Sequence, residues 1–281
     1  MNIKKIFNRL YVLLFLCAIP LFSQGVDLKI VVFSVNSGDS SLILFPNNKL
    51  MLIDTGVPAR TEDTVIPFLQ RHGITHLDYF LGTHPHPDHM DGVPNLEAGG
   101  YIDAATVFWD WNTFDYAETF TIEGTDWFIA NTRDTALWGT DANLNSVSYR
   151  FEWNGFVYSG AGDEGIGSMN RFMDDYPALV PAHVRNTAHH GWGPNDRTFL
   201  EAINADLYIV SCTTKSKTVN NGYQVIEAAA NTVGAPLALT GEVGVGNVYI
   251  RVSSGSDWDF KYCPLSKTHI IPDFYTPPPI D

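Results

Sequence analysis

Residues 83–92 read Thr-His-Pro-His-Pro-Asp-His-Met-Asp-Gly. This stretch places three imidazoles and one carboxylate within six positions, at His84, His86, Asp88 and His89. Imidazole and carboxylate groups are the protein ligands that suit zinc, manganese and iron. A chance gathering of surface histidines does not readily produce four ligand-type residues so close together. The stretch therefore predicts a metal site, and residues 83–92 are called the metal loop below.

The metal loop is predicted to leave a buried strand. Residues 77–81 read Leu-Asp-Tyr-Phe-Leu, a short apolar run that is typical of such a strand. Pro85 and Pro87 each fix φ and keep the preceding residue extended, which argues against a helix in this stretch. We therefore expect a stiff, non-helical loop at the end of a strand.

Strand-like and helix-like patterns alternate along the rest of the chain and predict an α/β layered domain. The predicted strands cover residues 28–34, 41–45, 49–53, 77–81, 105–108, 146–153, 155–159, 207–211, 237–239 and 247–252. The predicted helices cover residues 62–71, 168–175, 196–205 and 223–232. The patterns do not by themselves give the number of layers.

The order His-x-His-x-Asp-His resembles the signature of the metallo-β-lactamase-fold hydrolases. Three further parts of the chain follow the order of that family: Asp54 after an apolar strand, Asp163 after a strand and a glycine-rich turn, and the His189-His190-Gly run. The resemblance spans roughly residues 28–262. It implies a four-layer αββα metallo-β-lactamase-like sandwich.

The resemblance also implies two divalent metal ions and their ligands. The first ion would be held by His84 and His86, the second by Asp88 and His89, and Asp163 would bridge the two. Asp54 would support the metal loop without binding metal. Zinc is the first choice for both ions. Manganese is the second, because a site poor in nitrogen ligands and rich in oxygen ligands moves toward manganese.

His189 and His190 share the last ligand position of the family. One of them would complete the second metal site, and the sequence does not decide which. The other would face the substrate as a proton donor or hydrogen-bond donor, because a histidine can titrate near neutral pH. Asp88, His189 and His190 are therefore the candidate catalytic residues.

One ligand of the family pattern is missing. No histidine lies between His89 and His183, and residues 143–149, Asn-Leu-Asn-Ser-Val-Ser-Tyr, stand where a third histidine motif is usual. Asn145 or water would then fill the open position at the first ion or support the site. Together with residues 35–43, Val-Asn-Ser-Gly-Asp-Ser-Ser-Leu-Ile, this departure is similar to the soluble hydrolase domain of competence DNA-uptake channel proteins.

The two ends of the chain are predicted to lie outside the hydrolase domain of residues 25–270. Residues 1–24 combine three basic residues with an apolar run at 10–22, which is typical of a signal peptide and implies export to a periplasm or beyond the cell. The apolar run is shorter than the ~20 residues that span a bilayer, so no stable membrane insertion is expected. Residues 271–281 form a proline-rich tail.

Charge narrows the class of partner. Loss of residues 1–24 removes three basic and no acidic residues, which changes the formal net charge from −14 to −17. A strongly acidic surface repels polyanions, because non-specific nucleic-acid binding depends on neutralising phosphates. Long nucleic acid is therefore an unlikely substrate, whereas a small molecule or a short phosphodiester is compatible with this charge. The same acidity could also serve only solubility.

Aromatic and acidic residues alternate in residues 108–116, Phe-Trp-Asp-Trp-Asn-Thr-Phe-Asp-Tyr. Trp109, Trp111 and Tyr116 are candidate substrate-binding residues, because ring faces beside the metal ions could hold a base, a sugar or a cation. The alternative is that these rings pack into a sheet face. The two are equally compatible with the sequence.

Two cysteines, Cys212 and Cys263, remain after removal of the signal peptide. In an oxidising compartment they could form a disulfide, and they could equally be two separate buried residues. The sequence does not decide between these two states, and it gives no oligomeric state.

These features predict an exported, zinc- or manganese-dependent binuclear hydrolase that attacks phosphodiesters with a metal-bound hydroxide. The alternative within the same class is a carboxyl ester, lactone or β-lactam hydrolase. An alternative of another class is a non-catalytic exported ligand-binding protein on the same fold. Redox chemistry at iron is a weaker third possibility.

Overall fold

The computed structural model describes residues 27–213, 221–242, 245–263, 271 and 274–275. The predicted signal peptide and most of the predicted tail lie outside these residues. Within the described part of the chain, no helix has the length and apolar character needed to cross a bilayer.

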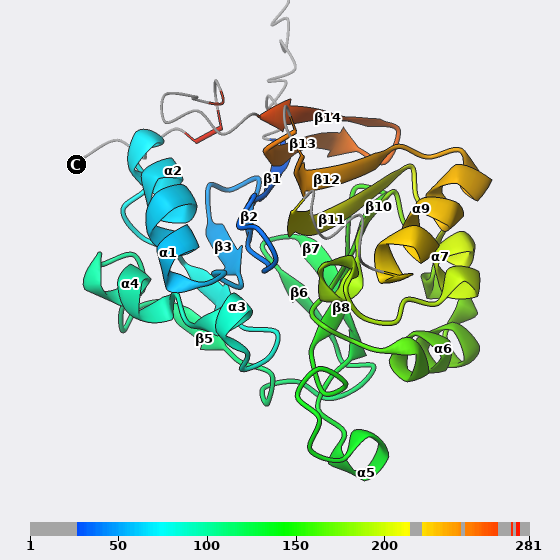
Figure 1. Cartoon of the computed structure of the whole chain (residues 1–281). Helices are drawn as coiled ribbons and strands as arrows, with labels where there is room; N and C mark the ends of the chain where they lie inside the picture. The colour runs from blue at the N-terminus through cyan, green and yellow to red at the C-terminus, as the bar shows by residue number, and fades with distance from the viewer. Residues whose placement is uncertain (1–26, 214–220, 243–244, 264–270, 272–273, 276–281) are drawn as a thin grey trace, which may run out of the picture.

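The strands form two seven-stranded mixed sheets (Figure 1). The first sheet contains, in spatial order, β14 (Asp257–Cys263), β13 (Asn247–Ser254), β1 (Leu28–Val32), β2 (Ser41–Leu44), β3 (Leu50–Ile53), β4 (Tyr79–Leu81) and β5 (Val107–Trp109). The second contains, in spatial order, β12 (Leu237–Gly241), β11 (Leu207–Thr213), β10 (Val184–Asn186), β9 (Phe156–Ala161), β8 (Ser148–Trp153), β7 (Thr125–Asn131) and β6 (Thr119–Ile122).

Central strands such as β1 and β9 are buried on both faces, and their successive side chains point alternately to the core between the sheets and to the core beneath the helices. On β1, Ile30 and Val32 belong to the core between the two sheets, whereas Val31 packs in the core beneath the helices of the first sheet. On β9, Tyr158 belongs to the central core and Val157 to the core beneath the helices of the second sheet. The strands therefore read as nearly continuous apolar runs instead of alternating ones.

Helices cover the outer face of each sheet (Figure 1). The first sheet is covered by α1 (Pro58–Arg60), a π-helical turn (Thr61–Val65), α2 (Ile66–Arg71) and α4 (Val93–Ala98). The second is covered by α6 (Ile166–Asp175), α7 (Arg197–Ile203) and α9 (Asn221–Val233). This arrangement is the predicted four-layer αββα sandwich. The remaining helical segments are α3 (Pro87–Met90), α5 (Thr135–Trp138) and two 3₁₀ turns (Pro177–Leu179 and Ala188–Gly191).

The metal loop contains the one-turn helix α3, so the expectation of a wholly non-helical loop is wrong. Pro87 is the first residue of this helix, where a missing backbone N–H leaves no hydrogen bond unmade and the fixed φ suits the helix. The preceding His86 is extended, with φ −74° and ψ 151°. The proline rule therefore holds for the His-Pro-His half of the loop only.

Four strands, β6, β7, β10 and β14, lie outside the predicted ranges. β6 and β7 form a hairpin in the aromatic part of the chain, where Phe120 pairs with Trp127 across the two strands. The two rings stack with centroids 5.9 Å apart, in the central core. Packing within a sheet therefore accounts for these two rings, which follow the aromatic stretch of residues 108–116.

Cys212 and Cys263 are free and buried. Cys212 packs among the helices of the second sheet, whereas Cys263 packs in the outer core of the first sheet. The two thiols thus belong to separate cores, and these two cysteines of the described residues form no disulfide with each other.

We expect the protein lacking residues 1–24 to contain two free thiols that react only after denaturation, since both side chains are buried. A thiol titration with and without denaturant measures this directly. A mass lower by two hydrogens, together with a melting temperature that falls on reduction, would contradict it.

Candidate metal centre

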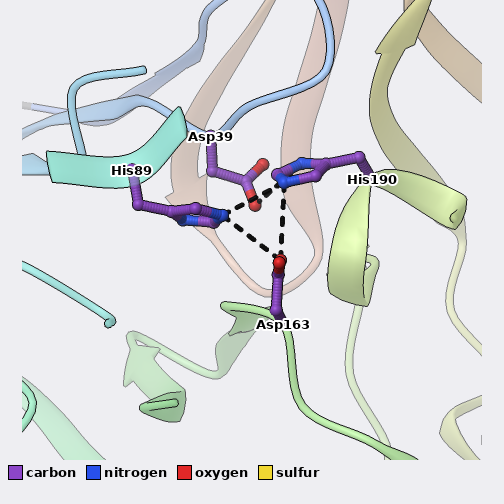
Figure 2. Close-up of side chains that lie close together, drawn as sticks. All are labelled: Asp39, His89, Asp163 and His190. Carbon is purple, nitrogen blue, oxygen red and sulfur yellow. Dashed lines mark hydrogen bonds and ion pairs between the residues drawn. The ribbon is translucent and has the colours of Figure 1, made fainter. Parts of the chain in front are cut away.

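The predicted ligands come from separate parts of the chain and lie close together, and Figure 2 shows three of them, His89, Asp163 and His190. β3 and β4 are parallel neighbours in the first sheet, and β9 and β10 are parallel neighbours in the second. The metal loop follows β4, Asp163 follows β9, and His189 and His190 follow β10. Carboxyl ends of parallel strands are the usual place for ligand sites in α/β folds. The topology therefore brings residues more than 100 positions apart to one edge.

One cluster of ligand atoms forms around His89 and His190. Their Nε2 atoms lie 3.1 Å apart. Asp163 Oδ1 lies 3.2 Å from His89 Nε2 and 3.4 Å from His190 Nε2. Asp88 Oδ2 lies 3.4 Å from His190 Nε2. These four side chains surround one position, which corresponds to the predicted second metal ion.

A second cluster forms around His84 and His86. His84 Nε2 lies 3.1 Å from His86 Nδ1 and 3.5 Å from Asp163 Oδ2. His189 Nε2 lies 3.5 Å from the same carboxylate oxygen. Asp163 therefore presents Oδ1 to one cluster and Oδ2 to the other, which is the geometry of a bridging carboxylate.

The donor set fits a pair of divalent cations. With Zn–N bonds of 2.0–2.1 Å, two ligands of a tetrahedral site lie about 3.3 Å apart, close to the separations in both clusters. Asp39 adds a buried carboxylate whose two oxygens accept no hydrogen bond from the described residues. Burial raises the pKa of Asp39 to about 6, and a charge buried in this way needs a compensating partner. A cation between these groups would supply it.

The pKa values of two carboxyl groups show how the histidines act on them. Burial would raise the pKa of Asp163, yet the neighbouring His190 and His89 hold it well below its usual range. Burial would also raise the pKa of Asp88, but a hydrogen bond from His190 and the positive charge of His89 lower it to about 2. Both groups are therefore carboxylates at neutral pH, as metal ligands must be.

Asp54 supports the metal loop through hydrogen bonds to its residues. Its Oδ1 accepts the backbone N–H of Thr83 at 2.8 Å, and its Oδ2 accepts the Thr83 hydroxyl at 2.7 Å. The same Oδ2 lies 2.7 Å from His89 Nδ1. A carboxylate on the far nitrogen of a ligand histidine fixes the ring and its tautomer, which leaves Nε2 free for metal.

The two consecutive histidines face different clusters. His190 is buried beside His89, whereas His189 is partly exposed and lies on the side of His84. Both residues have positive φ, 54° for His189 and 52° for His190. Non-glycine residues rarely adopt this conformation, and it is often found at functional sites. The turn thus directs two neighbouring imidazoles to one site.

The side-chain amide of Asn145 forms hydrogen bonds with the backbone of the loop that surrounds it. Its Oδ1 accepts the backbone N–H of Asp134 at 2.8 Å, and its Nδ2 donates to the backbone oxygen of Asp141 at 2.6 Å. Because the amide oxygen already accepts a hydrogen bond, Asn145 supports the loop beside the metal loop. This supporting position is one of the two that the sequence left open.

Two of the three candidate aromatic residues, Trp109 and Trp111, pack against the central core, whereas Tyr116 contacts residues of α6. Trp109 stacks on Tyr79, with centroids 5.7 Å apart, against the central core. The Tyr116 hydroxyl donates to Asp175 at 2.9 Å, and Arg171 lies over its ring. Trp111 lines a pocket of about 350 Å³ that reaches Pro85 of the metal loop. Of the three, Trp111 is the one that lines this pocket.

Three charged residues beside the site were not predicted from the sequence. Asp39 lies in the loop between β1 and β2, within residues 35–43, and its position between two apolar strands was an available signal. Glu164 follows Asp163 and forms a buried ion pair with Arg185 at 2.8 Å. Nothing in the local sequence pairs two residues that are 21 positions apart.

Comparison with known proteins agrees with this geometry. Residues 34–100 match the family model described as the metallo-beta-lactamase superfamily, and this range contains Asp39, Asp54 and the metal loop. A metallo hydrolase from the hyperthermophilic archaeon Ignicoccus hospitalis has a similar structure, with a TM-score of 0.50 and 12% identity, over 83% of this chain and 98% of that one. The chain has the metallo-β-lactamase fold. With the ligand clusters, the family match supports a metal-dependent hydrolase.

Other similarities are weaker. A metal-dependent hydrolase of the β-lactamase superfamily has a TM-score of 0.47 and 13% identity, over 75% of this chain and 95% of that one. A diphosphatase of the PhnP family has a TM-score of 0.45 and 13% identity, over 68% of this chain and 91% of that one. The similarity to competence DNA-uptake channel proteins stays a prediction.

One further match covers only a short stretch of this chain. The small ribosomal subunit protein uS19 of Metallosphaera sedula is 38% identical over 58 residues, which are 21% of this chain and 40% of that protein. The chain thus spans less than half the length of this curated relative. A match of this extent carries no statement about fold or activity here.

We expect Asp54→Ala to lower the free energy of unfolding by about 1–3 kcal/mol, because Thr83 and His89 would lose a buried hydrogen-bond partner. Thermal and denaturant unfolding of the metal-free protein measure this loss, with Asp91→Ala as a control at an exposed acidic residue of the same loop. Unchanged unfolding with complete loss of metal would show instead that Asp54 is a metal ligand.

Proposed function

We propose that this protein is an exported hydrolase that uses two divalent metal ions, zinc or manganese, to cleave phosphodiesters of modest size. The observation that carries the proposal is the Asp163 carboxylate, whose two oxygens face two separate ligand clusters. Export rests on the composition of residues 1–24 and is proposed on that ground alone.

Paired metal ions acidify a bound water and stabilise charge on the attacking and leaving oxygens of a displacement. The chain holds and orients the other groups. Asp163 fixes the spacing of the two clusters, and Asp54 fixes the His89 ring. Of the two consecutive histidines, His189 is the partly exposed one, so it is positioned to donate a hydrogen bond to a substrate oxygen. Burial lowers the pKa of His189, which keeps this imidazole neutral near pH 7.

The pocket beside the metal loop supports a substrate with an aromatic or flat group and a negative charge. Trp111 offers a ring face, and Arg133 is the cation that lines the same pocket. Arg133 donates to the neutral Asn112 Oδ1 at 2.6 Å, and among the described residues it has no carboxylate partner. Its charge is therefore available to an anionic substrate on a chain that is otherwise strongly acidic.

Two other functions stay open as outcomes of experiment. Carboxyl ester, lactone or β-lactam hydrolysis would use the same ligand clusters, since two metal ions also polarise a carbonyl group. A non-catalytic binding protein would need the pocket, but it would have no use for seven ligand-type side chains around two positions.

A panel of substrates tests which class of bond the protein cleaves. The protein lacking residues 1–24, loaded with zinc or with manganese, should bind about two ions and hydrolyse bis(p-nitrophenyl) phosphate faster than a p-nitrophenyl carboxyl ester, a chromogenic β-lactam or plasmid DNA. Chelation should abolish turnover and added metal should restore it. Asp163→Ala and Asp88→Ala should lose at least ~100-fold in rate, while Asp91→Ala keeps the activity.

Each outcome of this panel decides one point. Faster cleavage of the ester or the β-lactam would replace the phosphodiester by that substrate class. Rapid plasmid degradation would show that the net charge does not exclude long DNA. Two bound ions with no hydrolysis of any substrate would favour the binding protein, and no bound metal would refute the metal centre itself.

A substitution of Trp111 tests whether the pocket beside the metal loop binds the substrate. Trp111→Ala should raise KM for an aryl phosphodiester at least ~5-fold with little change in kcat, because stacking on an aromatic side chain contributes about 1–3 kcal/mol to binding. Tyr262→Ala is the matched control, since Tyr262 is an exposed aromatic on β14, at the other edge of the first sheet. Equal KM values for both variants would remove Trp111 from the substrate site.

A further inference from the structure

The loop between β1 and β2 carries a carboxylate that accepts no hydrogen bond from the described residues, although His190 lies at ion-pair distance. Asp39 is buried, and neither of its carboxylate oxygens accepts a hydrogen bond from the described residues. A buried carboxylate without hydrogen bonds is costly, and one that persists in a folded protein calls for a compensating cation. The roles given above to the other side chains leave Asp39 unexplained.

Asp39 faces the His89–His190 cluster (Figure 2). One ligand atom from each of Asp39, His89, Asp163 and His190 can be chosen so that all four lie within 4.8 Å of one another, and all four residues are buried. Two ligands on opposite sides of an ion with bonds of about 2.1 Å lie about 4.2 Å apart. The separations therefore suit one shared ion.

Asp39 and Asp54 occupy different positions relative to the histidine rings. Asp54 Oδ2 lies 2.7 Å from His89 Nδ1 and forms a hydrogen bond that orients the ring. Asp39 Oδ2 lies 3.5 Å from His190 Nδ1, and the two atoms form no hydrogen bond. Asp54 is thus already satisfied by protein groups, whereas the oxygens of Asp39 remain available to an ion.

The backbone holds Asp39 against the metal loop. The Asp39 N–H donates to the backbone oxygen of Asp88 at 3.3 Å. A Cβ at Gly38 would lie 2.7 Å from that same oxygen, so only glycine permits this approach. The Ser40 hydroxyl donates to the backbone oxygen of Asp54 at 3.1 Å. Residues on both sides of Asp39 are therefore fitted to the metal site.

We propose that Asp39 is a direct oxygen ligand of the metal ion held by His89, His190, Asp88 and Asp163. This inference rests on the proposed two-metal site and adds a residue to it. The ion at the His89–His190 cluster would then have two nitrogen donors and three oxygen donors. The ion at the His84–His86 cluster would have two nitrogen donors and one oxygen donor, with His189 nearby. The two sites are thus unequal, and the oxygen-rich one is the tighter site and the one that better accepts manganese.

The test is metal titration of the protein without substrate. Wild type, Asp39→Asn and Asp91→Asn are titrated with Mn²⁺ and with Zn²⁺ by calorimetry, and the ions retained are counted by elemental analysis. Asp39→Asn should lose at least ~100-fold in affinity at the tighter of two sites, with a larger loss for Mn²⁺ than for Zn²⁺. Asp91→Asn, at an exposed acid of the metal loop, should bind as wild type does.

A spectrum separates a ligand from a residue that only orients His190. The visible bands of bound Co²⁺ become more intense as the coordination number falls. Asp39→Ala, which leaves no side-chain oxygen to coordinate, should therefore raise the intensity of the bands of the tighter site. Loss of an orienting group would instead weaken binding and leave the spectrum of the bound ion unchanged. Asparagine has nearly the size of aspartate, and a melting curve of each metal-free variant verifies that it is folded.

The outcomes separate the two proposals. Wild-type protein that binds no metal would refute the proposed function. Wild-type protein that binds two ions, with an Asp39→Asn variant of equal affinity or an Asp39→Ala variant of unchanged Co²⁺ spectrum, would overturn the assignment of Asp39 and leave the rest of the site intact.

Discussion

The concentration of buried negative charge where the two sheets meet is the constraint on which the rest of this structure depends. Asp39, Asp54 and Asp163 are all buried there, and protein hydrogen bonds satisfy only Asp54 fully. Burying a charged carboxylate costs several kcal/mol unless opposite charge or hydrogen-bond donors compensate the loss of hydration. The surrounding imidazoles compensate in part, and bound cations would do so more completely. Metal binding and stability are therefore coupled in this fold.

The same edge also holds the unusual backbone conformations of the site. Asp54, His189 and His190 have φ between 52° and 54°, a conformation that residues other than glycine rarely adopt. Each such residue costs of the order of 1–3 kcal/mol and is tolerated only when its surroundings fix it. Here the fixing groups are two parallel strand pairs packed on three apolar cores. A rigid sandwich thus maintains a turn that points two consecutive imidazoles at one site.

The sequence predicted best what is local. The ligand spacing in residues 83–92 and the buried strands before Asp54 and Asp163 are visible in a short window of residues. α3 was missed because the proline rule was applied to the whole loop, although Pro87 can begin a helix. Asp39 was missed because its relation to the site depends on the β1–β2 loop meeting the metal loop in space. The assignment of His190 and His189 to different clusters likewise depends on the φ angles of one turn, which neither residue type specifies.

Surface charge and site charge act over different distances, and this difference bears on substrate size. Screening at physiological ionic strength limits the field of exposed carboxylates to about 8 Å, whereas buried charges are screened much less. A small phosphodiester near the metal centre would therefore respond mainly to the bound cations and to Arg133. A long duplex would also lie over acidic surface well beyond the pocket, where no bound ion offsets the repulsion. Under the proposed function, the net charge would therefore limit the length of an anionic substrate, and the reaction itself would depend on the metal centre.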